Sequence, residues 1–240
     1  MNLRFVETSR QRNVLFAVEL LDAVTLERVK KGITLDAQDL RRKPVSNSGG
    51  LFVWALDAQG LRRMPVCNSG GLFVWIKQTP KEDTTALRSL AIDTGELPYQ
   101  SATLDLSQVQ APQLTTITLA PRVNYPFQAG VTALRGTLIE SNYGARRPVL
   151  DGIVRLQWID QFSNWIDSPP VSKTETDKGD FVAILRFLPN AKPDLNADGT
   201  IQVRLQADRP TAIARYSAPF NLTPGRLSAP VPFAWDELNP

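Results

Sequence analysis

Apolar and polar residues alternate along Ile153-Val154-Arg155-Leu156-Gln157-Trp158. A period of two is typical of a β-strand with one buried face. The same alternation occurs in residues 115–119 and 201–205, and residues 181–185 (Phe-Val-Ala-Ile-Leu) are continuously apolar, as in a strand covered on both faces. We expect no helix longer than two turns, and the best short candidate is residues 81–90. The chain is therefore predicted to be all-β.

The length and composition of the chain indicate two globular domains. It has 240 residues, of which 42% are hydrophobic and 21% are charged, and domains commonly contain about 100 to 150 residues. Residues 120–126 include two prolines and are expected to form a stiff linker. We predict one β-sandwich in residues 1–122 and a second in residues 123–240. The second ends in an extended arm with Phe233 and Trp235, which either lies along its own domain or docks into a neighbouring chain.

Histidine is absent and cysteine is scarce, and the absence of histidine argues against an enzyme. The chain has no histidine and a single cysteine, Cys67. Histidine is the commonest general base and zinc ligand and the usual partner of a nucleophilic Ser or Cys. A lone cysteine cannot form an internal disulfide, which favours a reducing compartment. We therefore expect a non-catalytic protein without a cofactor.

The N-terminus and the charge pattern bear on location and partners. The apolar run at residues 14–18 is interrupted by Glu19 and makes a poor signal peptide, and no run of about 18 apolar residues is present to span a membrane. The net charge is +3, and the basic residues form short groups at 41–43, 62–63 and 146–147. Nucleic-acid binders instead gather Lys and Arg on one face. We expect a cytoplasmic protein that binds no nucleic acid.

A 20-residue segment occurs twice in the first half of the chain. Residues 35–54 read LDAQDLRRKPVSNSGGLFVW, and residues 56–75, displaced by 21 positions, read LDAQGLRRMPVCNSGGLFVW. Each copy has a hairpin pattern, because Asn-Ser-Gly-Gly supplies a turn before Leu-Phe-Val-Trp. Two copies are too few for a solenoid. We expect one copy to extend a sheet or protrude as a hairpin, either as a neutral insertion or as a protein contact made by Arg62, Arg63, Leu72, Phe73 and Trp75.

A short acidic segment matches the first half of a calcium-binding loop. Asp194, Asn196 and Asp198 stand at alternate positions before a glycine, which is the oxygen-ligand spacing that Ca²⁺ needs. The twelfth position is Leu205, however, where the complete loop has a bidentate Glu. Asp-Gly before an alternating strand is also a strong hairpin signal. We expect a hairpin turn here, with a calcium site as the alternative.

The chain has five tryptophans, and most of them lie in strand patterns. Core or inter-domain packing is the ordinary role of such residues. Trp165 instead lies in a polar, turn-like segment at residues 161–167. It is the candidate for a surface aromatic residue that contacts another protein or stacks on a carbohydrate.

The second half of the chain resembles a known family. Residues 131–138 (Val-Thr-Ala-Leu-Arg-Gly-Thr-Leu) are followed by residues 147–156 (Arg-Pro-Val-Leu-Asp-Gly-Ile-Val-Arg-Leu) and by residues 174–181 (Thr-Glu-Thr-Asp-Lys-Gly-Asp-Phe). This order is similar to the prealbumin-like, carboxypeptidase-regulatory-type β-sandwich, and the resemblance covers residues 128–222. Residues 18–25 resemble the same sandwich more loosely. The resemblance implies a non-catalytic module.

A second resemblance rests on Gly-Leu-Phe-Val-Trp and on residues 96–99 (Glu-Leu-Pro-Tyr). These look like segments of proteins encoded with phage-tail-like contractile injection systems. The implied role is a structural or adaptor subunit of a large assembly, at a cap, baseplate or accessory position, contacting copies of itself and other subunits through edge strands and the C-terminal arm. The alternative is a carbohydrate- or small-ligand-binding module that uses Trp165.

Overall fold

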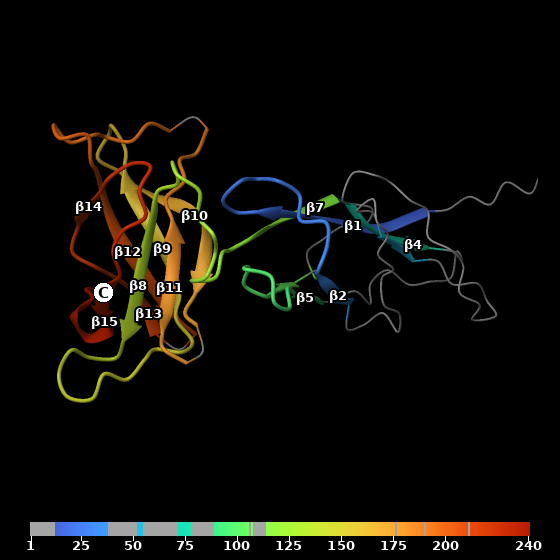
Figure 1. Ribbon diagram of the computed structural model, residues 1–240, viewed down its shortest axis with the longest axis horizontal. Coiled ribbons are helices and arrows are strands. Elements are labelled where there is room, and N and C mark those ends of the chain that lie inside the picture. Colours follow the sequence, from blue (N-terminus) through green and yellow to red (C-terminus); the bar gives the residue numbers. More distant parts are fainter. Residues whose placement is uncertain are drawn as a thin grey trace, which may run out of the picture. The chain divides into compact units, whose positions relative to one another are not determined.

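The structure is a computed structural model that describes residues 13–37, 52–54, 72–77, 89–105, 107, 114–175, 177–189, 191–210 and 212–240. Its regular secondary structure is β-strand (Figure 1), apart from a single 3-10 turn, η2 (Trp235–Glu237), among these residues. Within the same ranges, no helix has the length and apolar character needed to cross a membrane. The all-β prediction is confirmed.

The described chain separates into two compact units. The first unit contains the described residues up to Leu21, those from Glu27 to Gly95, and those from Ser101 to Ile117. The second unit contains Thr118–Pro240 together with two short segments from earlier in the chain, Asp22–Leu26 and Glu96–Gln100. The predicted division after residue 122 did not anticipate that these two segments belong to the second unit.

The strands that precede residue 120 form two sheets. One sheet has the order β3-β4-β1-β7, and the other has the order β2-β5-β6. The strands are β1 (Asn13–Asp22), β2 (Thr34–Ala37), β3 (Phe52–Trp54), β4 (Leu72–Lys77), β5 (Ser89–Asp93), β6 (Ala102–Asp105) and β7 (Leu114–Leu119). In β5, the buried residues Leu90 and Ile92 alternate with more exposed neighbours. The helix candidate at residues 81–90 is wrong at its end, because residues 89 and 90 begin β5, and residues 81–88 lie outside the described residues.

The two copies of the repeat supply neighbouring strands. β3 and β4 are parallel, and the Phe-Val-Trp of residues 52–54 is in register with the Phe-Val-Trp of residues 73–75. On its other side β4 pairs antiparallel with β1. One copy therefore extends the sheet beyond the other, which is one of the two arrangements expected from the sequence. Arg62 and Arg63 lie outside the described residues.

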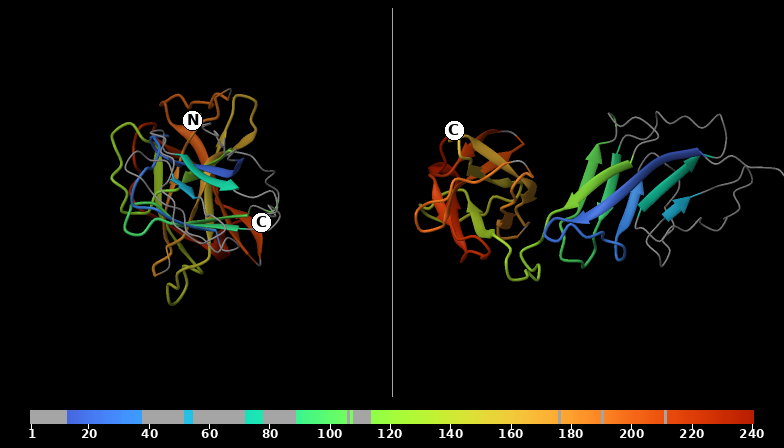
Figure 2. Two further views of the ribbon diagram at one scale, coloured as in Figure 1. Left: turned by 90° about the vertical axis from the view of Figure 1, so that its right-hand side faces the viewer. Right: turned by 90° about the horizontal axis from the view of Figure 1, so that it is seen from above.

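The strands that follow residue 130 form two further sheets, which pack face to face as two layers (Figure 1 and Figure 2). The five-stranded sheet has the order β10-β9-β12-β13, with β14 also paired to β12, and the three-stranded sheet has the order β11-β8-β15. The strands are β8 (Ala133–Ile139), β9 (Ile153–Ile159), β10 (Trp165–Lys173), β11 (Asp180–Ile184), β12 (Ile201–Arg209), β13 (Ala212–Tyr216), β14 (Phe220–Leu222) and β15 (Val231–Ala234).

One apolar core lies between these two sheets. Val154, Leu156 and Trp158 of β9 contribute to it from the five-stranded sheet, and Leu138 and Phe181 contribute from the three-stranded sheet. All five side chains are fully buried. Burying a large apolar side chain stabilises a fold by about 1.5 to 3 kcal/mol, so this cluster accounts for much of the stability of the sandwich. The strand predictions for residues 153–158 and 201–205 are confirmed, and the strand predicted at 181–185 is present but ends at residue 184.

The segment predicted to be a linker is packed within the second unit. Tyr125 is buried, and its ring centroid lies 4.8 Å from that of Phe127. The backbone N–H of Arg122 donates to the carbonyl of Pro98 at 2.9 Å, and the N–H of Gln100 donates to the carbonyl of Ala120 at 2.8 Å. This segment is therefore part of a folded unit.

Candidate functional site

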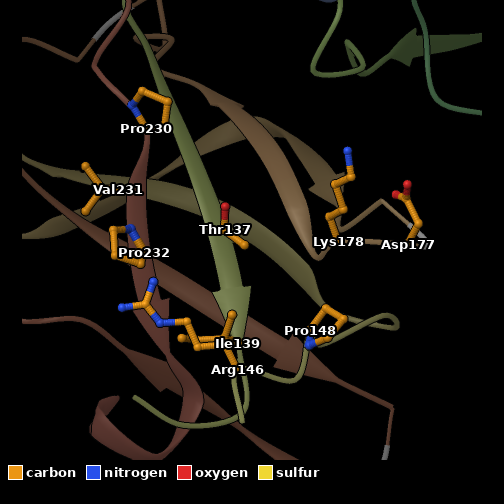
Figure 3. Close-up of a pocket in the computed structure, with 9 residues that line it drawn as sticks. All are labelled: Thr137, Ile139, Arg146, Pro148, Asp177, Lys178, Pro230, Val231 and Pro232. Carbon is orange, nitrogen blue, oxygen red and sulfur yellow. The ribbon is translucent and has the colours of Figure 1, made fainter. Parts of the chain in front are cut away.

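A groove of about 480 Å³ lies over β8 and β15, and we call it the β15 groove (Figure 3). Thr137 and Ile139 of β8 line it; they alternate with the core residue Leu138, so Thr137 projects from the side of the sheet that faces away from the core. The other lining residues come from the loop after β8, the turn before β11 and the segment containing β15: Arg146, Pro148, Asp177, Lys178, Pro230, Val231 and Pro232.

Two glycines allow the walls of the groove to approach β8 closely. A Cβ atom at Gly136 would lie 2.4 Å from Cζ of Phe181 and 3.0 Å from the carbonyl oxygen of Val231. Gly179 has a φ of +71°, and a Cβ atom there would lie 2.4 Å from the carbonyl oxygen of Leu138. Glycine is required at both positions because only it has no Cβ. Gly179 thereby holds the turn that carries Asp177 and Lys178 against the end of β8.

The groove combines an apolar strip with charged rims. Ile139 is buried at its base, whereas Val231 is 39% exposed on the wall. Arg146 and Lys178 are exposed, and neither makes an ion pair or side-chain hydrogen bond with any described residue. In Figure 3, Arg146 extends toward Pro232 and Lys178 stands on the opposite wall beside Asp177. The hydroxyl of Thr137 donates to Oδ1 of Asp180 at 2.6 Å, so this polar pair is already satisfied.

The C-terminal arm lies along its own domain. β15 pairs in parallel with β8, and Trp235 is only 8% exposed within the core between the sheets. The ring of Phe233 lies 6.1 Å from that of Phe181 and 6.0 Å from that of Phe220. Of the two arrangements left open by the sequence, docking of this arm into a neighbour is therefore not the one observed. Neither aromatic side chain is available as an exposed anchor.

Trp165 is covered by a cation. It begins β10 and is half-buried, and the guanidinium of Arg204 lies 4.4 Å from the centre of its ring. The same guanidinium lies 4.3 Å from the ring centre of Tyr216, and its Nε donates to the side-chain oxygen of Gln157 at 2.6 Å. One face of the Trp165 ring is thus occupied by an intramolecular cation–π contact. Leu72, Phe73 and Trp75, the remaining predicted contact residues, lie in β4.

The facing edges of the two sheets are closed by side chains. Ser168 and Ser172 of β10 are buried, and their hydroxyls donate to the carbonyls of Ile184 and Val182 on β11. Farther along β10, the side-chain amide of Gln100 donates to the carbonyl of Lys173 at 2.8 Å and accepts from its N–H at 2.7 Å. These side chains occupy backbone groups that another strand would need for pairing.

The opposite edge of the three-stranded sheet is formed by β15, which contains Pro232. Proline has no N–H to donate, and in sheets it is confined to edge strands, the first residue of a strand or bulges. Pro230 immediately precedes the strand and removes a second donor. Addition of a partner strand is therefore disfavoured at this edge too.

The acidic segment at residues 194–200 forms a turn, as the Asp-Gly signal predicted. The carboxylate of Asp198 accepts hydrogen bonds from the N–H and hydroxyl of Thr200, which lower the pKa of Asp198. The side-chain amide of Asn196 donates to the hydroxyl of Thr200 at 2.9 Å. Within the described ranges, no three His, Cys, Asp or Glu residues are grouped as metal ligands, Asp194 and Asp198 included.

Asp22 is a buried acidic residue whose bonds are structural. It is 5% exposed, and its Oδ2 accepts hydrogen bonds from the hydroxyls of Tyr125 and Tyr99 at 2.6 and 3.0 Å. Its Oδ1 accepts from the N–H of Val24 at 2.6 Å. Burial lowers the pKa of Arg186, and the negative charge of Asp22 opposes that shift. The carboxylate fixes the segment Asp22–Leu26 within the second unit.

The residues that line the β15 groove lie in separate segments of the sequence, and no sequence pattern indicated that these segments meet. Arg146 belongs to a basic pair, Asp177 and Lys178 belong to a turn, and Pro230 and Pro232 belong to a proline-rich segment. They meet because β8 pairs with β11 on one side and, in parallel, with β15 on the other, about 95 positions later in the chain. The prolines flanking Val231 were the one local signal, since proline at alternate positions suits an edge strand.

No family model, curated protein or solved structure matches this chain.

Proposed function

We propose that the protein is a non-catalytic, protein-binding subunit of a larger assembly, and that its second unit holds a partner chain in the β15 groove. The observation that carries this proposal is the combination of an exposed apolar wall at Val231 with the charges of Arg146 and Lys178, which pair with no side chain in the part of the chain that the structure describes. Grooves that recognise proteins commonly pair apolar contact with a few polar groups that fix orientation.

Three further features support recognition through a face of the sandwich. The edges at β10 and β11 carry side-chain bonds from Ser168 and Ser172, and the edge at β15 carries proline. The aromatic residues of the C-terminal arm are used inside their own domain. The absence of histidine from the sequence removes the commonest catalytic general base. Together these favour a passive binding surface over strand exchange or catalysis.

The resemblance of the Gly-Leu-Phe-Val-Trp and Glu-Leu-Pro-Tyr segments suggests a setting for this role, namely a phage-tail-like contractile injection particle. In that setting the protein would be a cap, baseplate or accessory component in the cytoplasm, present in several copies. The parallel pairing of β3 with β4 supports such a role for the first unit, since the repeat enlarges a sheet that other subunits can contact. We therefore expect the chain to be recovered within a particle of that kind.

The test is a charge placed in the groove wall. Val231→Asp introduces a carboxylate at an exposed position, so the fold should be retained while apolar contact with a partner is lost. We expect the wild-type chain to sediment with a large complex in extracts of the cells that encode it, and the variant to sediment as free protein. Val171→Asp is the matched control, because Val171 is 45% exposed on β10, outside the groove. If the Val231→Asp and Val171→Asp variants sediment in the same way, the proposal is contradicted.

A carbohydrate-binding role for Trp165 is less well supported. Stacking on a sugar needs an open ring face, and Arg204 occupies one face of this ring at 4.4 Å. Arg204 is itself held by Tyr216 and Gln157, so uncovering that face would break several contacts at once.

A further inference from the structure

The β15 groove also indicates the chemistry of its occupant, and this inference rests on the function proposed above. Arg146 and Lys178 are the two cations of the lining, and Asp177 is its single anion. Arg147, adjacent to Arg146 in the loop, is also exposed. The charges of the described residues at the rim are therefore predominantly positive, and cations on opposite walls attract a carboxylate that lies between them.

The apolar part of the groove runs beside these cations. Val231 and Pro232 form one side, Pro148 forms the other, and Ile139 closes the base. A segment in extended conformation places successive side chains on opposite sides with a period of two. Such a segment can set apolar side chains on the strip while its alternate acidic side chains reach the rim.

We propose that the β15 groove binds an extended segment of another protein in which acidic residues alternate with small apolar ones. Arg146 and Lys178 hold the carboxylates, and the wall formed by Val231 and the two prolines holds the apolar side chains. Since Asp177 stands beside Lys178 (Figure 3), a basic segment would meet Arg146 and Lys178 as like charges while gaining only one favourable contact. The groove therefore discriminates against basic segments.

The probe for this inference is a fluorescent octapeptide of alternating Asp and Val, titrated against the purified full-length chain and followed by anisotropy. The same peptide with Lys in place of Asp is the charge control. We expect saturable binding of the Asp peptide, none of the Lys peptide, and weakening by added salt because exposed charges are screened. Absence of saturable binding of the Asp peptide up to about 1 mM, equivalent to about 4 kcal/mol, would overturn the inference.

Charge reversal locates the binding in the groove. Arg146→Glu combined with Lys178→Glu should weaken binding of the Asp peptide at least about tenfold. Lys31→Glu combined with Lys192→Glu changes the net charge equally at exposed positions outside the groove, and should leave the affinity within about twofold. The conservative pair Arg146→Lys and Lys178→Arg should keep most of the affinity. Equal weakening by both reversed pairs would show attraction by net charge alone and would contradict the inference.

The two proposals can fail separately. If Val231→Asp abolishes assembly while the reversed pair Arg146→Glu and Lys178→Glu still assembles and binds peptide like the wild type, the groove docks a partner but not through carboxylates. The inference then falls and the proposed function stands. If Val231→Asp assembles normally, the proposed function falls whatever the peptide does.

Discussion

The hydroxyl of Tyr125 donates a 2.6 Å hydrogen bond to Oδ2 of Asp22, a residue 103 positions earlier in the chain. The same oxygen accepts from Tyr99, so one buried carboxylate joins three segments of the second unit. A buried carboxylate is tolerated only where hydrogen bonds replace the water that it loses. Asp22 satisfies that condition through two hydroxyls and two backbone N–H groups.

Asp22→Asn should destabilise the protein. The amide nitrogen that replaces one carboxylate oxygen cannot accept a hydrogen bond, which leaves a buried donor without its partner, and the cost of such a loss is about 1 to 3 kcal/mol. Tyr125→Phe removes one donor and should cost less. Urea unfolding measures both values. Asp36→Asn, at an exposed position, is the control, and an Asp22→Asn protein as stable as that control would show that the hydrogen bonds contribute nothing.

Gly179→Ala should be more destabilising than Gly199→Ala. Their φ angles are similar, at +71° and +76°, so adding a side chain strains the backbone to the same extent at both positions. Only at position 179 would the new Cβ collide with a carbonyl oxygen, that of Leu138, whereas nothing lies within 4 Å at position 199. We expect a difference of about 1 to 3 kcal/mol in the free energy of unfolding, since overpacking costs that much. If the two variants lose the same free energy of unfolding, the turn before β11 is not in close contact with β8.

Ser172→Ala should loosen the closed edge between β10 and β11. The hydroxyl of Ser172 is the described partner of the Val182 carbonyl on that edge, and both residues are fully buried. Leaving a buried carbonyl unpaired costs about 1 to 3 kcal/mol, which urea unfolding can detect. Ser141→Ala in an exposed turn should change stability by less than about 0.5 kcal/mol. A Ser172→Ala protein that unfolds like the Ser141→Ala protein would contradict the role assigned to the hydroxyl.

The turn at residues 194–200 should weaken in acid. Hydrogen bonds from Thr200 lower the pKa of Asp198 below the ordinary 3.8, so the folded turn favours the ionised carboxylate. The stability that this carboxylate adds is present above pH 3.8 and is lost as the pH falls through the lowered pKa. The amide resonance of Thr200 should therefore shift in that window, and the shift should vanish in Asp198→Asn. A Thr200 shift that persists in the variant would assign the transition to another group.

Sequence patterns predicted the strands well and the groove poorly. Alternation along residues 153–158 identified β9, because burial of one face is a local property of the chain. The turn before residue 201 was likewise predicted, from Asp198-Gly199. By contrast, the helix candidate failed at residues 89 and 90, where pairing with β2 and β6 determines the conformation.

The candidate site depends on contacts between residues that are far apart in the sequence, and no local sequence pattern predicts such contacts. Trp165 was expected on the surface from its polar neighbours, but Arg204 covers one face of its ring from a neighbouring region of the sheet. Trp235 was expected in an arm that either lies along its own domain or docks into a neighbour, and its side chain is buried in the core of its own sandwich. Val231 and Arg146 become neighbours in one groove only after β15 has paired with β8. Long-range strand pairing is the step that sequence reasoning could not supply.

Site-specific photo-crosslinking from position 231 tests the central claim most directly. A photoreactive amino acid would replace Val231 in one protein and Val171 in another, each expressed in the cells that encode the chain. We predict one discrete adduct with a partner protein from position 231, with the cross-linked partner peptide rich in acidic residues, and none from position 171. An adduct pattern that is the same from both positions, or no adduct from position 231, would contradict the assignment of the β15 groove as the recognition site.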